Sequence, residues 1–167
     1  SRGLLHHDEG PGRELLWASA QLHTCGKSIN ISAYHKHSWY LIRHGELLGY
    51  SESEHLMVAA IGRYHRRSLP KKRHESWQLI EDRDQRSTVT SMSLLLRLAA
   101  ALDRRPAAVI ATLQVTSRQN AVCIDLKPLA AAPGEQAPDL SLERWSLRCC
   151  AEVVQESCGL GLRVPEP

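Results

Sequence analysis

The sequence contains no phenylalanine, so aliphatic side chains and a few tryptophans must fill any core. Hydrophobic residues still make up 43% of the 167 residues, which suffices for a packed core and argues against a disordered chain. The longest apolar runs, such as the one around residues 94–102, are much shorter than the roughly 20 residues of a membrane span. The beginning of the chain has no signal-peptide pattern. We therefore expect a cytoplasmic protein that does not enter a membrane.

The cysteines lack the pattern of a disulfide framework or a zinc knuckle. There are five of them, an odd number, and no C-x-x-C pair occurs. Reduced thiols that serve in packing, including the neighbouring Cys149 and Cys150, are the expected state. The net charge of +3 is too small to indicate an anionic partner by itself, so local clusters of charge decide that question.

The first two thirds of the chain have the apolar spacing of helices. Residues 13–22, 34–48 and 90–105 are predicted helices. Between the last two, a third helix is predicted to begin at residue 52 and to end no later than Pro70, and a short helical turn is expected at 77–80. Ser51 and Glu54 form the pattern of a capping box at the start of the third helix. Trp17, Trp39 and Trp145 are expected on apolar stripes, in the core or in an interface.

The pattern changes after Pro106. Residues 109–116 and 121–126 alternate and are rich in β-branched side chains, which predicts a hairpin with a turn at 117–120. A helix at 141–157 and a strand at 160–164 follow. The fold class predicted is mostly α, with a helical domain at 1–106 and a small ββαβ domain at 107–167. Arg104 and Arg105 are expected to close the preceding helix, where positive charge favours the dipole.

Histidines are abundant, and their spacing resembles the HD-domain superfamily of metal-dependent phosphohydrolases. His23, Gly26 and Lys27 match its Leu-His-Asp-x-Gly-Lys string, and His65 and Asp103 match later positions in order. Thr24, however, stands where the family has a metal-binding aspartate, and a hydroxyl is a poor substitute for a carboxylate. The resemblance therefore implies a degenerate HD-like helical bundle. We expect no metal, with His23, His65 and Asp103 as vestigial candidates.

A second resemblance covers residues 15–105 and is more specific. Leu16-Trp17-Ala18, His35-Lys36-His37-Ser38, Gly49-Tyr50-Ser51 and Arg63-Tyr64-His65-Arg66-Arg67 are similar to the helical third domain of the exopolyphosphatase and guanosine pentaphosphate phosphohydrolase (Ppx/GppA) family. This resemblance implies that catalysis and Mg²⁺ belong to two N-terminal actin-like domains. No P-loop and no nucleophile elbow occurs in this sequence, so no catalytic residue is assigned to it.

The resemblance also implies a larger enzyme and its substrates. The sequence begins with Ser1 rather than Met, and we expect it to be a piece of a longer protein that is inactive by itself. The parent enzyme would release terminal phosphate from inorganic polyphosphate or from guanosine pentaphosphate, a choice that the sequence does not make. The C-terminal domain would assist in forming a homodimer.

A dense run of basic residues begins near the end of the third predicted helix. It consists of Arg63, His65, Arg66, Arg67, Lys71, Lys72, Arg73 and His74. A polyanion such as polyphosphate can be held by lysine and arginine through charge-assisted hydrogen bonds. The alternative to polyanion binding is that the basic run forms an ordinary solvated face next to a loop. Nucleic acid is disfavoured because Trp77 is the only aromatic residue that follows the run, so stacking platforms are scarce. The candidate polyphosphate-binding residues are Lys36, Arg63, Arg66, Arg67, Lys71, Lys72 and Arg73.

Two other functions remain open at this stage. One is a stand-alone HD-type metal-dependent nucleotide phosphohydrolase, which would bind a stoichiometric metal near His23 and His65. The other is a non-catalytic regulatory module that binds a nucleotide or a protein. Binding of polyphosphate that weakens with salt would separate the polyanion-binding function from the regulatory one.

Overall fold

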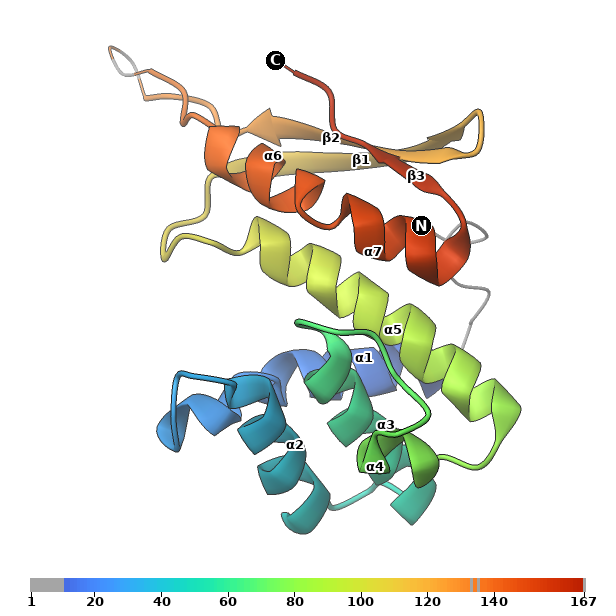
Figure 1. Ribbon diagram of the computed structural model, residues 1–167. Coiled ribbons are helices and arrows are strands. Elements are labelled where there is room, and N and C mark those ends of the chain that lie inside the picture. Colours follow the sequence, from blue (N-terminus) through green and yellow to red (C-terminus); the bar gives the residue numbers. More distant parts are fainter. Residues whose placement is uncertain (1–10, 133, 135, 167) are drawn as a thin grey trace. The chain divides into compact units, whose positions relative to one another are not determined.

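The computed structural model describes residues 11–132, 134 and 136–166, which fall into two compact units (Figure 1). The helical unit comprises the described residues up to Arg97, and the C-terminal unit begins at Leu98. The division lies within helix α5 (Arg83–Leu102), whereas the sequence analysis placed a domain boundary at Pro106. Together the units confirm a mostly α fold with a small α/β part. No helix in the described ranges is long and apolar enough to cross a membrane.

The helical unit is built around helix α3. Its elements are α1 (Pro11–Leu22), the 3-10 helix η1 (Cys25–Ser28), α2 (Tyr34–His44), α3 (Glu52–Tyr64), α4 (Glu75–Gln78) and the larger part of α5. Helices α1 and α2 both pack against α3. Four consecutive α3 residues, Val58 to Ile61, have no exposed surface, because neighbours cover this helix on several sides. Ser19 of α1 adds a buried hydrogen bond from its hydroxyl to the carbonyl oxygen of Val58, at 3.1 Å.

The capping box that the sequence predicted is confirmed at the start of α3. The Ser51 hydroxyl accepts a hydrogen bond from the backbone N–H of Glu54, at 3.4 Å. The Glu54 carboxylate in turn accepts one from the backbone N–H of Ser51, at 2.8 Å. The Ser51 hydroxyl also donates to the Glu54 carboxylate, at 2.6 Å, and this bond, followed by the one from the Ser51 backbone N–H, holds the pKa of Glu54 below its usual value. Local sequence therefore fixes where this helix begins.

Several helix ends differ from the prediction. Helix α2 stops at His44, because the backbone at Gly45 is extended. Helix α3 ends at Tyr64, which agrees with Pro70 as the latest position at which it could end. Helix α5 begins at Arg83 rather than at residue 90, and the Asp82 carboxylate accepts a hydrogen bond from the backbone N–H of Gln85 in its first turn.

Two of the three tryptophans expected on apolar stripes lie outside the core. Trp17 on α1 is 65% exposed and Trp145 on α6 is 57% exposed. Trp39 on α2 packs against the core of the helical unit, as expected. An apolar stripe predicts which side chains share a face of a helix, but it does not show whether another element covers that face.

The C-terminal unit is a three-stranded sheet with two helices. Strands β1 (Ile110–Arg118) and β2 (Ala121–Pro128) form the predicted antiparallel hairpin, and β3 (Gly161–Arg163) pairs with β2 in parallel, giving the order β1-β2-β3. The turn consists of Gln119 and Asn120, with φ angles of 47° and 60°. Two left-handed residues in a row suit the twist of a tight hairpin.

The long helix predicted at residues 141–157 is divided into α6 (Ser141–Arg148) and α7 (Ala151–Cys158). At the junction the backbone N–H of Cys150 bonds to the carbonyl oxygen of Leu147, three residues back, so the helix tightens there. The order of elements in this unit is therefore ββααβ, where the sequence predicted ββαβ. All five cysteines lie in the described residues, and no disulfide joins them.

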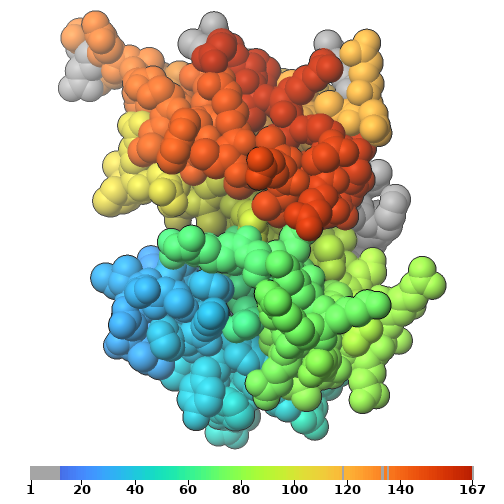
Figure 2. Space-filling model, viewed as in Figure 1, coloured from blue at the N-terminus to red at the C-terminus, as the bar shows by residue number. Residues whose placement is uncertain are grey.

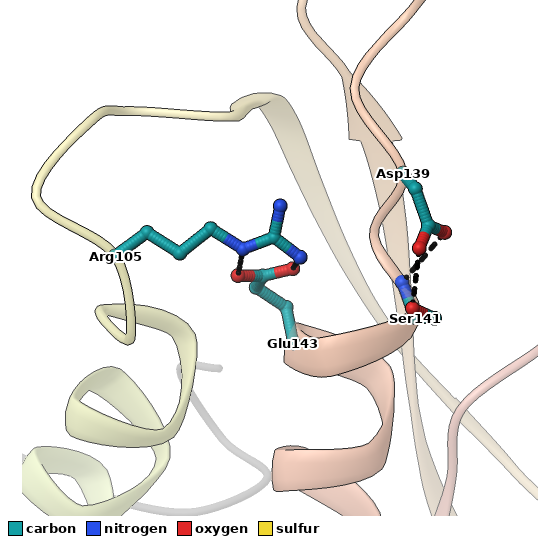
Figure 3. A network of polar contacts seen from close by, with 4 residues as sticks. All are labelled: Arg105, Asp139, Ser141 and Glu143. Carbon is teal, nitrogen blue, oxygen red and sulfur yellow. Dashed lines mark hydrogen bonds and ion pairs between the residues drawn. The ribbon is translucent and has the colours of Figure 1, made fainter.

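An ion pair connects the loop that follows α5 to α6 within this unit (Figure 3). The Arg105 guanidinium donates a hydrogen bond to Glu143 Oε2, at 3.2 Å, and its Nε lies 2.9 Å from Glu143 Oε1 in the ion pair. Glu143 has no exposed surface, so its charge depends on this partner. Arg105 was expected to close the preceding helix, but it lies beyond the end of α5 and neutralises Glu143 instead. Nearby, Asp139 accepts hydrogen bonds from the backbone and hydroxyl of Ser141 at the start of α6.

Candidate anion-binding pocket

The two histidines of the HD-like pattern lie side by side in the helical unit. The ring centroids of His23 and His65 are 4.8 Å apart. The Nδ1 of His23 bonds to the carbonyl oxygen of Ala20, at 2.7 Å, and the Nδ1 of His65 bonds to that of Gly62, at 2.6 Å. A carbonyl oxygen only accepts hydrogen bonds, so both rings carry a proton on Nδ1. Each imidazole is thus oriented by its own helical segment.

The second nitrogen of His65 is also occupied. The Tyr34 hydroxyl lies 3.2 Å from His65 Nε2, and since Nδ1 carries the proton, the hydroxyl is the donor. Burial lowers the pKa of His65 to about 3, so the ring is neutral at physiological pH. In this neutral form both ring nitrogens of His65 have a hydrogen-bond partner. His65 therefore serves as an internal structural imidazole.

The residues present do not fit a dinuclear metal centre. Thr24 supplies no carboxylate beside His23. Throughout the described part of the chain, which includes Asp103, no three His, Cys, Asp or Glu side chains gather closely enough to hold a metal ion.

Gly26, the glycine of the HD-like string, has a structural role in η1. A Cβ atom at this position would lie 2.2 Å from the carbonyl oxygen of Tyr34 and 2.3 Å from the backbone nitrogen of Ser38. The Ser38 hydroxyl accepts a hydrogen bond from the Gly26 N–H and donates one to the His23 carbonyl oxygen. Helix α1 ends at Leu22, where the sequence predicted, so Gly26 lies beyond this helix in η1. Gly26 permits η1 to touch α2.

The basic residues converge on a pocket of about 300 Å³ in the helical unit. Four of the seven candidate polyphosphate-binding residues line it, namely Lys36, Arg63, Arg66 and Arg73. The other candidates, Arg67, Lys71 and Lys72, are exposed but do not line it. Figure 2 shows the segment that follows α3, in green, at the surface of this unit. The complete lining is His35, Lys36, Arg63, Tyr64, Arg66, Ser68, Arg73 and His74, with no carboxylate among these residues.

Arg97 of α5 fixes the loop that carries Arg66. Its guanidinium donates to the carbonyl oxygens of Tyr64, His65 and Arg67, at 2.9–3.0 Å. These carbonyls are at or just past the C-terminus of α3, where backbone acceptors lack helical partners. Arg67 itself has a left-handed backbone with φ of 68°, which turns the chain sharply. A cation at a helix C-terminus also interacts favourably with the helix dipole.

His35 contributes a buried imidazole to the pocket. The residue is only 7% exposed, and its Nδ1 atom has no hydrogen-bond partner. Burial, followed by the nearby charges of Arg63 and Arg66, lowers the pKa of His35 to about 4. The residue lies in the first turn of α2, whose N-cap Ala33 offers no side-chain cap. The positive end of this helix therefore adds to the cationic character of the pocket.

Hydrogen bonds fix the tautomer of His74, which lines the pocket. Its Nδ1 accepts a hydrogen bond from the backbone N–H of Lys71, at 3.2 Å, and lies 3.2 Å from the Tyr64 hydroxyl. A backbone N–H can only donate, so the neutral ring carries its proton on Nε2. Burial and the charges of Arg63 and Arg73 lower the pKa of His74. The pocket thus presents cations and neutral imidazoles together.

Sequence reasoning missed three residues of this site: Tyr34, His35 and Arg97. His35 adjoins the candidate Lys36, so its position in a basic segment was an available signal. Arg97 is the single charged residue in the apolar stretch from Met92 to Leu102, which marks a polar role. Nothing in the sequence indicates that Tyr34 would meet His65.

Comparison with known proteins agrees with this architecture. The family model described as Ppx/GppA phosphatase, domain III, matches residues 4–148, and the chain belongs to the Ppx/GppA phosphatase family. A curated relative is the guanosine-5'-triphosphate,3'-diphosphate pyrophosphatase of Pseudoalteromonas translucida (strain TAC 125). It is 45% identical over 60 residues, which are 36% of this chain and 12% of that protein. The matched segment therefore spans about an eighth of that relative's length.

Proposed function

We propose that this chain is a substrate-binding and assembly region of a larger Ppx/GppA phosphatase, and that its pocket binds a phosphate chain. The observation that carries the proposal is the pocket lining. Arginine and lysine side chains from α2, from α3 and from the segment after it converge there, and no carboxylate is among the lining residues. Such a site favours a multiply charged anion through charge-assisted hydrogen bonds. Inorganic polyphosphate and guanosine pentaphosphate both have this chemistry.

The chemical step of the parent enzyme is assigned to other domains. In this proposal, N-terminal actin-like domains carry Mg²⁺ and the water-activating carboxylate, and they hydrolyse the terminal phosphoanhydride. This chain holds the phosphate chain, is inactive alone, and contributes to a cytoplasmic homodimer. The alternative of a stand-alone metal-dependent hydrolase would need a carboxylate beside His23 and His65. At those positions the sequence supplies Thr24, and the Tyr34 hydroxyl engages His65.

The test compares two variants that remove equal charge. Arg66→Ala with Arg73→Ala removes two pocket residues, whereas Lys71→Ala with Lys72→Ala removes two exposed lysines outside the lining. Isothermal titration calorimetry with long-chain polyphosphate should show a loss of affinity of about tenfold or more for the pocket pair. The lysine pair should lose only the smaller, salt-screened contribution of long-range charge.

Circular dichroism of both variants checks that the helices persist. Repeating the titrations at rising salt separates diffuse attraction from contacts within the pocket. Equal losses for the two pairs would mean that the basic run is a solvated face with no specific site. Absence of any binding to the unaltered chain would refute the proposed function altogether.

A further inference from the structure

One polar atom in the pocket has no partner within the protein. His35 is more than nine-tenths buried, yet its Nδ1 makes no hydrogen bond. Burying a polar group without a hydrogen bond costs free energy, so native proteins rarely do it without a reason. The other buried histidine nearby, His65, has partners on both ring nitrogens. His35 therefore has an unused hydrogen-bonding capacity and belongs to the lining of the pocket.

The charges around His35 come from every element that surrounds the pocket, and all of them are positive or neutral. Lys36 follows it on α2, Arg63 lies on α3, and Arg66 and Arg67 lie on the loop after α3. His65 is a neutral neighbour within the unit, and Arg73 and His74 complete the lining of the pocket. No aspartate or glutamate is among these lining residues. In the absence of an anion, this field opposes a further positive charge on the ring.

A phosphate chain bound in the pocket would counteract the positive field that opposes protonation of His35. Its negative oxygens compensate the arginines and offer acceptors to imidazole N–H groups, and both changes favour the protonated ring. We propose that binding of a phosphate chain is coupled to uptake of one proton from solvent, and that His35 is the residue that accepts it. This inference rests on the proposed function, since it concerns the same pocket. It adds that affinity for the anion depends on pH through a single identified group.

The direction of the effect follows from linkage. The pKa of His35 is about 4 in the free protein and rises when the anion binds. Affinity for the phosphate chain therefore increases as pH falls from about 6.5, the ordinary histidine value, toward the value of the free protein. The increase can reach about tenfold per pH unit, because one proton is involved. Internal phosphates of a long chain are strong acids and keep the same charge over this range.

Proton uptake is measured directly by calorimetry in buffers with different ionisation enthalpies. The 167-residue chain is titrated with long-chain polyphosphate at about pH 5.5, where His35 is mainly neutral before binding. We expect uptake of up to one proton per site. His35→Asn, which keeps a hydrogen-bonding group but does not titrate, should abolish the uptake. His44→Asn is the matched control, because His44 is exposed on the same helix and does not line the pocket.

A second measurement does not require the variant to fold. NMR titration of the His35 ring in the unaltered chain should show its pKa rising by more than about one unit when polyphosphate is present. An unchanged pKa, or uptake that persists in a folded His35→Asn variant, would overturn the assignment. Binding without any proton uptake would refute this inference and leave the proposed function intact. No binding at any pH would refute both.

Discussion

Gly26 lies where the helical unit leaves no room for a side chain. The backbone of η1 lies so close to the first turn of α2 that a Cβ atom would clash with the backbone at Tyr34 and Ser38. Backbone atoms cannot rotate away as the end of a long side chain can. The contact also places His23 and Tyr34, which both approach the ring of His65.

Gly26→Ala should therefore lower the free energy of unfolding by about 2–4 kcal/mol, in the range of strongly destabilising core changes. Urea unfolding followed by circular dichroism measures it. Gly62→Ala is the control, since its Cβ would lie 3.3 Å from the end of the Ile42 side chain and at an ordinary contact distance of 3.8 Å from His23 Cα, within a helix that favours alanine. A similar, small effect of both substitutions would show that η1 can move away from α2.

Helix α5 positions the basic loop through one side chain. Arg97 donates hydrogen bonds to three carbonyl oxygens at the end of α3 and beyond it. These bonds hold the loop in its sharp turn at Arg67 and so place Arg66 at the pocket. A planar guanidinium can serve several acceptors at once, whereas a lysine ammonium acts as a point charge.

Arg97→Lys should consequently destabilise the helical unit by about 1.5–3 kcal/mol, the range of hydrogen bonds from charged groups. The same conservative change at Arg83, which is exposed at the start of α5, is the reference and should have little effect. Unfolding midpoints in urea for the two variants provide the comparison. Indistinguishable midpoints would mean that the loop keeps its conformation without Arg97.

At the scale of the whole molecule, buried neutral histidines link the stability of the helical unit to pH. The pKa of His35 is about 4 and that of His65 about 3, whereas both would be near the ordinary value of 6.5 in the unfolded chain. The unfolded state thus binds more protons between these values. The stabilisation is complete above about pH 6.5 and is lost progressively as pH falls toward 4 and then 3.

His65→Gln should reduce the dependence of the unfolding free energy on pH between about 6.5 and 4. The expected reduction is about 1.4 kcal/mol per pH unit, the contribution of one titrating group. In a Trp145→Phe background, the remaining tryptophans, Trp17, Trp39 and Trp77, all lie in the helical unit, so fluorescence reports its unfolding alone. An unaltered pH slope in the variant would show that His65 is not the group responsible.

The sequence by itself determined the elements that depend on neighbouring residues along the chain. The capping box at Ser51 and Glu54, the hairpin around Asn120 and the mostly α class all follow from periodicity and turn chemistry, which act over a few residues. The resemblance to the Ppx/GppA family could also be found from short strings of residues. Four candidate cations, Lys36, Arg63, Arg66 and Arg73, were identified by local clustering of charge.

The tertiary structure decided which groups meet and which remain without partners. Arg97 reaches carbonyl oxygens more than 25 residues earlier, and Tyr34 reaches His65 across a similar separation, so neither contact leaves a mark on local sequence. Lys71 and Lys72 belong to the basic run but lie outside the pocket, and Trp17 lies on an apolar stripe that stays exposed. Burial depends on atoms brought from distant positions, and it is burial that makes His35 an unpaired imidazole among cations.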